Sequence, residues 1–137
     1  MFAVLDTNVL ISGLRSSTGA SFAVLNAIRF GQIKIALSVS LAIEYEDVAL
    51  RPCMVPGLTP TQIGVVMDVL CALAHHQKVF FMWRPHLPDP GDDMVLELAL
   101  AAGSPYIIIN NIKDFAGCES LGIRAIKPAE ALKLIKP

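Results

Sequence analysis

Apolar and polar positions alternate between two patterns along this chain. Short, continuous apolar runs predict buried strands at residues 2–5, 33–37, 78–83, 105–109 and 123–126. Between these runs, apolar residues recur with helical spacing, and we expect helices from about residue 9 and over 21–30, 41–51, 60–76, 94–102 and 129–136. Continuous apolar strands that alternate with helices are typical of a parallel sheet covered on both faces. The pattern therefore predicts one α/β domain over residues 1–137.

Capping residues support the helix starts. Ser40 is a candidate N-cap for the helix over 41–51, and Thr59 followed by Pro60 opens the long helix that follows. The strand expected at 78–83 leads into a loop rich in Pro and Gly over 84–93. The next helix then begins at Met94 and stops at Gly103.

Composition changes the picture in one respect, because the chain is unusually apolar. Apolar residues make up 54% and charged residues 17%. This predicts a homodimer, with the poorly polar stretch 63–74 as the surface buried between the subunits. Asp68 and Glu97 interrupt the most apolar windows, and neither window reaches the ~18–20 apolar residues of a membrane span. We therefore expect no membrane association.

Charge and cysteine content limit the function classes further. The net charge of −1 excludes a large basic surface for nucleic acid, so any such contact must come from local clusters. Arg15, Arg51 and Lys113 are candidates, and they are equally readable as ordinary surface charges. The three cysteines are widely spaced and no basic region precedes an apolar stretch. Both features predict a cytoplasmic protein with reduced thiols.

Two carboxylates stand where an ordinary core has none. Asp6 directly follows the first strand, at the sheet edge where sites form in parallel α/β folds. It could equally cap the next helix, and this position alone leaves capping and ligation open. Glu44 falls within the apolar stripe marked by Leu41, Tyr45 and Val48. A carboxylate on an inward face needs a partner, either a cation or a buried Arg or Lys.

More acids gather before the helix at 94–102. Asp92 and Asp93 follow a Pro-Gly pair, and Asp89 lies just before them. The helix dipole favours one acid at such a position, but three exceed what capping requires. Asp93 also lies in line with Leu96 on the side expected to face the core.

Polar residues follow the strand at 105–109 in the same way. Asn110, Asn111 and Asp114 are expected at the same sheet edge as Asp6. Converging carboxylates repel one another and raise each other's pKa unless a cation lies among them. Oxygen ligands from Asp, Glu and Asn suit Mg²⁺ or Mn²⁺, whereas the Cys and His residues lack the spacing of a zinc site.

Four blocks of sequence resemble the PIN-domain nucleases. These blocks are LDTNVLIS, SLAIEYEDVALRP, DPGDDMVLELALAAG and YIIINNIKDF, and the resemblance extends from Phe2 to Phe115. The chain is most similar to VapC-type toxin components of bacterial toxin–antitoxin pairs. The resemblance implies a three-layer α/β/α sandwich with a mainly parallel sheet, metal-dependent cleavage of RNA, and a small antitoxin protein as partner.

The resemblance also implies the ligands of one or two Mg²⁺ or Mn²⁺ ions. Asp6 matches the first acidic ligand of the family and Glu44 the second. Asp93 matches the third, with Asp92 as the neighbouring possibility. The polar residues that support the first carboxylate are Thr7 and Asn8.

The fourth acidic position departs from the family pattern. Members commonly carry a TxD or TxN block, and this chain has Ile109 and Asn111 at the two defining positions. The Asn111 carbonyl oxygen can still bind a metal but adds no charge, and Asp114 could supply a nearby charge instead. This departure puts a second metal ion in question.

Two other function classes compete with a ribonuclease that cleaves single-stranded or looped RNA. The first is a catalytically weak or inactive PIN-fold module that binds RNA or a partner. The second is a haloacid-dehalogenase-like phosphatase with Asp6 as nucleophile. That group typically has an Asp two residues after the first, where this chain has Asn8. A nucleotide-binding Rossmann domain is disfavoured because no Gly-rich phosphate loop is present.

Overall fold

The computed structural model describes residues 1–79 and 90–136, with the side chains of residues 90–93 outside the described part. The strands are β1 (Phe2–Leu5), β2 (Lys34–Leu37), β3 (His75–His76), β4 (Tyr106–Ile108) and β5 (Arg124–Ile126). The helices are α1 (Thr7–Arg15), α2 (Ala20–Arg29), α3 (Val39–Ala49), α4 (Pro60–Leu73), α5 (Pro90–Ala102) and α6 (Pro128–Ile135). Two 3₁₀ turns, η1 (Ile112–Phe115) and η2 (Cys118–Leu121), lie between β4 and β5. Over these ranges, no helix is both long and apolar enough to cross a membrane.

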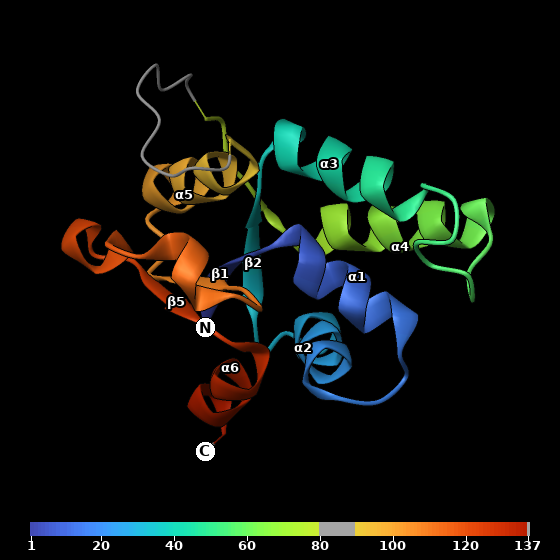
Figure 1. Ribbon diagram of the computed structural model, residues 1–137, viewed down its shortest axis with the longest axis horizontal. Helices are drawn as coiled ribbons and strands as arrows, with labels where there is room; N and C mark the ends of the chain where they lie inside the picture. The colour runs from blue at the N-terminus through green and yellow to red at the C-terminus, as the bar shows by residue number, and fades with distance from the viewer. Residues whose placement is uncertain (80–89, 137) are drawn as a thin grey trace.

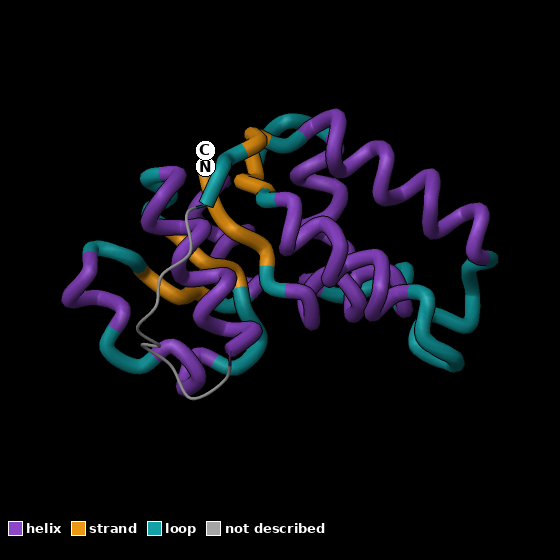
Figure 2. Tube along the Cα trace, turned by 90° about the horizontal axis from the view of Figure 1, so that it is seen from above, coloured by secondary structure: helices purple, strands orange, loops and turns teal. Residues whose placement is uncertain are grey.

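The five strands form one parallel sheet in the order β3-β2-β1-β4-β5. The first strand, β1, is central and pairs with β2 on one side and β4 on the other. Helices α1, α3 and α4 lie on one side of β2 and α5 lies on the other (Figure 1). The view from above likewise places the strands between helices (Figure 2). The predicted three-layer α/β sandwich with a parallel sheet is confirmed.

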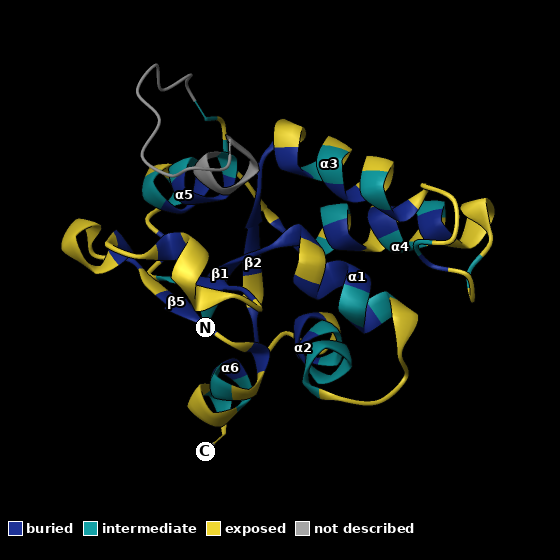
Figure 3. Ribbon diagram, viewed as in Figure 1, coloured by how far each residue is buried: buried dark blue, intermediate teal, exposed yellow. Residues whose placement is uncertain are grey.

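The central strands are buried on both faces, which explains their continuous apolar sequences (Figure 3). Ala3, Val4 and Leu5 of β1 have no exposed surface, and the same is true of Ile107 and Ile108 of β4. At the carboxyl end of β1 and β4, only the residues beyond the strands can present polar groups to solvent or to a ligand. Any site on this sheet must therefore lie at its edge, in the loops that follow the strands.

Helix α3 starts earlier than predicted. The expected cap was Ser40, but Ser38 is the N-cap, and its Oγ accepts a hydrogen bond of 3.1 Å from the Leu41 amide. β2 ends at Leu37, so the helix begins directly after the strand and Ser38 is the residue at the junction. The predicted cap at Thr59 is confirmed, with a full capping box to Gln62.

The region after α4 also differs from the prediction. The helix expected over 60–76 ends at Leu73, and His75 and His76 form β3 beside Ala36 and Leu37 of β2. The open edge of β2 offers these residues backbone hydrogen bonds that a helix end lacks, and Gln77 N continues the pairing to Leu37 O at 2.9 Å. Of the strand expected at 78–83, residues 78 and 79 are not in a strand. The remainder lies outside the described residues.

Helix α5 begins at Pro90 rather than Met94. Proline is favoured in the first turn of a helix because its missing N–H has no partner there. The end at Ala102 agrees with the prediction, and Gly103 follows with a φ of +69°. The backbone of Asp92 and Asp93 is therefore helical, whereas the expected loop over 84–89 lies outside the described residues.

A close contact at Gly13 sets the packing of α1 against α2. A Cβ at this position would lie 2.5 Å from Leu25 Cδ1 and 3.0 Å from the Ser21 carbonyl oxygen. Gly64 in α4 is also helical, but a Cβ there would meet no atom within 4 Å. The two glycines therefore provide a matched pair in different surroundings.

We expect opposite effects on stability from alanine at these two positions. Gly13→Ala overpacks the α1–α2 contact and should lower the free energy of unfolding by about 1–3 kcal/mol. Gly64→Ala gains helix propensity without a clash and should raise it by about 0.5–1 kcal/mol. Urea denaturation measures both, and equal effects of the two substitutions would contradict the α1–α2 packing.

Candidate metal centre

Asp6 lies at the centre of the carboxyl edge of the sheet. It directly follows β1, and its backbone N–H donates to Ile108 O at 3.0 Å, which continues the pairing with β4. Asp6 is also the N-cap of α1, since its Oδ2 accepts a hydrogen bond of 3.1 Å from the Asn8 amide. Only 7% of the residue is exposed. Asp6 therefore caps α1, as the sequence allowed, and its buried carboxylate has the backbone N–H groups of Asn8 and Thr7 as partners.

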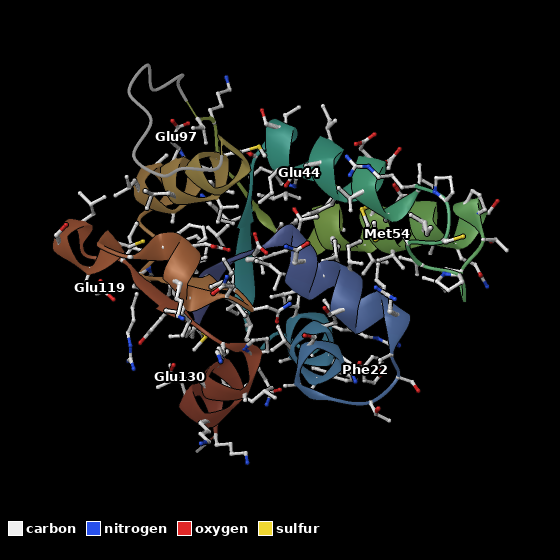
Figure 4. The ribbon with its side chains drawn as sticks, viewed as in Figure 1. Phe22, Glu44, Met54, Glu97, Glu119 and Glu130 are labelled. Carbon is white, nitrogen blue, oxygen red and sulfur yellow. The ribbon has the colours of Figure 1, made fainter. Side chains whose placement is uncertain are left out.

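Glu44 projects from α3 (Figure 4). It lies between the buried residues Leu41 and Tyr45 and is itself half-buried. Its Oε2 accepts a hydrogen bond of 2.5 Å from Thr7 Oγ1, the residue next to Asp6. The two ion pairs within the described residues, one at the end of α3 and one between β5 and α6, do not include Glu44. The salt-bridge alternative for Glu44 thus has no support there.

The surroundings of Asp6 disfavour the ionised form of its carboxyl group. Burial raises the pKa of this carboxyl to about 6, and the neighbouring charges of Glu44 and Asp114 push it in the same direction. The backbone N–H groups of Asn8 and Thr7 lower the pKa through hydrogen bonds, and the bond from Asn8 has a larger effect than either neighbouring charge but a smaller one than burial. A cation beside Asp6 would reverse the balance, so the arrangement fits an oxygen-ligated metal ion.

Tyr45 is a part of this site that the sequence did not reveal. Its side chain is 1% exposed, and its hydroxyl donates a hydrogen bond to the backbone carbonyl of Leu5, the last residue of β1. Burial raises the pKa of the phenol well above 10, so the hydroxyl keeps its proton. The available signal was the tyrosine within a buried stripe beside Glu44, because a buried hydroxyl requires an acceptor.

The loop after β4 lies beside the start of α1, as predicted. The Asn110 side-chain amide donates to Ser12 Oγ at 3.4 Å. Asn111 caps η1, with its Oδ1 accepting from the Lys113 amide at 3.3 Å and its Nδ2 donating to Asp114 Oδ1 at 3.2 Å. The Asn111 oxygen thus already has a backbone partner, whereas Asp114 is close enough to raise the pKa of Asp6.

For two of the remaining candidate residues, the structure describes the backbone but not the side chain. Asp92 and Asp93 belong to the first turn of α5, which packs against β1 and α3, but their side chains lie outside the described part. Where side chains are described, no group of three or more His, Cys, Asp or Glu residues lies close enough to hold a metal. The roles of Asp6, Glu44 and Asp93 as metal ligands therefore stay predictions. Arg51 forms a surface ion pair with Asp47 at 2.9 Å, and Lys113 is exposed on η1.

We expect Asp6→Asn to stabilise the metal-free protein at neutral pH. The raised pKa means that Asp6 favours folding below the unfolded value of 3.8 and loses this contribution as the pH rises through about 6. Asparagine keeps the cap and removes the charge, so the free energy of unfolding at pH 7.5 in a chelator should rise by roughly 2–3 kcal/mol.

The pH dependence provides the check on this stabilisation. Urea titrations of wild type and variant should differ much less at pH 4.5 than at pH 7.5. Asp68→Asn is the matched control, because it removes the same charge from an exposed position on α4 and should change the stability by less than about 0.5 kcal/mol. A destabilised Asp6→Asn protein at pH 7.5 would show that Asp6 has a cationic partner.

Comparison with known proteins agrees with the fold. No curated protein matches the sequence. Among solved structures, a chain of VapBC2 from Rickettsia felis, crystallised with a DNA fragment from its promoter, superimposes with a TM-score of 0.57 at 13% identity. The superposition covers 93% of this chain and 98% of the other, so the two share a fold. The PIN domain family matches residues 3–113 of the sequence, and because this is most of its length, the chain belongs to that family.

Proposed function

We propose that the protein is a Mg²⁺- or Mn²⁺-dependent ribonuclease that hydrolyses phosphodiester bonds of RNA. The carrying observation is the Asp6 carboxylate, buried at the carboxyl edge of the sheet with Glu44 and Asp114 beside it. Such a group is costly in a folded protein unless a cation offsets its charge. Membership of the PIN-domain family supports a nuclease as the activity that this cation serves.

The chemistry of these oxygen donors suits one divalent ion. Asp6 and Glu44 would hold it, with Asp93 as the third ligand and Asp92 as its neighbour in the same helical turn. Asp114 would add charge at the edge of the site. A divalent cation here supplies Lewis-acid activation of water for attack on a phosphodiester, so no side-chain nucleophile is required.

The chain's own residues orient these carboxylates and admit the substrate. Thr7 fixes one oxygen of Glu44, and the Asn8 amide fixes one oxygen of Asp6. Among the described residues, Lys113 on η1 is the cation nearest in the sequence to the loop after β4. With a net charge of −1, the protein would bind RNA through a few local contacts, which favours accessible single-stranded or looped segments.

One observation favours a second candidate, an RNA- or partner-binding module without strong activity. Asn111 gives the fourth position no charge, and its oxygen accepts a hydrogen bond from the Lys113 amide. A site that loses this ligand has less negative charge with which to bind a second metal ion. The cleavage experiment below separates the two candidates.

The cellular role that we propose is that of a cytoplasmic toxin inhibited by a small antitoxin protein. The structural likeness to a chain of VapBC2 supports this role. We further propose a homodimer. Val65 and Val69 of α4 are 58% and 45% exposed, and they line a cavity of about 330 Å³ together with residues of α1 and α2. An apolar helix face of this kind is suited to burial against another chain.

We expect the purified protein, freed of any antitoxin, to cleave single-stranded RNA with Mn²⁺ or Mg²⁺ and not in the presence of a chelator. Asp6→Asn and Glu44→Gln should each reduce the rate by at least about 100-fold, because they remove metal ligands. Gel analysis of a labelled RNA measures the rate, with Asp68→Asn as the charge-matched control.

Two results would contradict the assignment in different ways. If the wild type cleaves no RNA with either metal, the binding module replaces the ribonuclease. If Asp6→Asn and Glu44→Gln cleave as fast as wild type, the activity lies at another site.

A further inference from the structure

Helix α3 forms hydrogen bonds with the two residues that flank Asp6. The Tyr45 hydroxyl donates to the Leu5 carbonyl oxygen, and Thr7 Oγ1 donates to Glu44 Oε2. Glu44 and Tyr45 are adjacent in α3, and their partners are the residues immediately before and after Asp6. The two hydrogen bonds therefore bracket Asp6, and we refer to them as the clamp.

The opposite side of Asp6 is fixed independently of α3. Its amide donates to Ile108 O at 3.0 Å, and its carbonyl accepts from Val9 N at 3.1 Å in the first turn of α1. These bonds fix the backbone of Asp6 relative to β4 and α1, but none of them involves α3. The position of Glu44 relative to Asp6 thus depends on how α3 is held against β1 and α1.

Without a cation, the negative charges of Asp6 and Glu44 do not favour a short distance between the two carboxylates. Two carboxylates that face the same point repel each other, and the repulsion grows where water is excluded. Leu41 is fully buried, so its packing holds α3 against the rest of the fold. Apolar contacts are not directional, however, and they do not set the exact position of the Glu44 side chain. Hydrogen bonds are directional, so the clamp can set the separation of the two carboxylates.

We infer that Tyr45 and Thr7 are positioning residues that hold Asp6 and Glu44 at the separation required for a shared divalent cation. The inference rests on the proposed function, because the cation belongs to that proposal. The sequence comparison assigns Tyr45 no role, and burial alone would make it an ordinary core residue. The purely structural alternative is that its hydroxyl simply satisfies a buried carbonyl.

Ser104 provides a control that separates these alternatives. Its side chain is 1% exposed, and its hydroxyl donates to Phe2 O at 3.2 Å and to Tyr106 O at 3.0 Å. Like Tyr45, it hydrogen-bonds a backbone carbonyl of β1, but at the opposite end of the strand. Ser104→Ala and Tyr45→Phe therefore remove similar bonds, and only the second lies at the site.

The test measures Mn²⁺ affinity by electron paramagnetic resonance of the free ion. Tyr45→Phe and Thr7→Val should each weaken binding about tenfold or more, the usual effect of removing a group that orients a ligand. Ser104→Ala should bind as tightly as wild type. Thr7→Ser, which keeps the hydroxyl, should restore most of the affinity lost in Thr7→Val.

A second readout does not depend on the metal. In metal-free protein, the amides of Asp6 and Val9 should exchange with deuterium several times faster in Tyr45→Phe than in Ser104→Ala, because the clamp restrains this junction locally. If either clamp variant fails to fold, the other is judged on the same two measurements.

Equal Mn²⁺ affinity in Tyr45→Phe, Thr7→Val and Ser104→Ala would overturn the positioning role, even if amide exchange increased. A wild type that binds no Mn²⁺ would instead refute the proposed metal site. In that case amide exchange alone tests the clamp. Exchange of the Asp6 and Val9 amides at the same rate in Tyr45→Phe as in Ser104→Ala would overturn it.

Discussion

The burial of one carboxylate at the end of the central strand is the constraint on which the site depends. β1 is covered on both faces, so the chain leaves it directly into a helix, and Asp6 occupies the junction. One of its oxygens caps that helix, which satisfies a local requirement of the fold. The charge itself remains poorly compensated, and burial raises the pKa of the carboxyl to about 6. A residue that only capped the helix could be neutral, so the retained charge points to a ligand.

The parallel sheet determines which other residues can reach this charge. All the strands run in the same direction, so the loops after β1, β2 and β4 emerge at one edge. Glu44 arrives on the helix after β2, and Asp114 arrives on the turn after β4. Residues separated by more than a hundred positions thus act on a single carboxyl group. A cost in stability of this kind is common at functional sites.

Much of the fold could be predicted from periodicity, because buried parallel strands have unmistakably continuous apolar sequences. The failures have physical causes. Ser38 and Ser40 are equally good caps by residue type, and only the end of β2 at Leu37 decides between them. His75 and His76 form a strand because β2 offers an open edge, which no local pattern reveals.

Some residues of the candidate site could be predicted from the sequence and others could not. Asp6 and Glu44 could be found because a carboxylate beside a strand, or on an inward helix face, is unusual in itself. The clamp could not, because the acceptor of the Tyr45 hydroxyl is a backbone carbonyl forty residues away in the sequence. Side-chain identity in the sequence says nothing about which carbonyl lies opposite.

The most direct measurement of the central claim is anomalous diffraction from a crystal soaked in Mn²⁺. The account predicts a manganese peak within about 2.0–2.3 Å of an Asp6 carboxylate oxygen, with Glu44 on the same ion or on a water bound to it. If no manganese lies beside the Asp6 carboxylate at a Mn²⁺ concentration at which the protein is active, the account is contradicted.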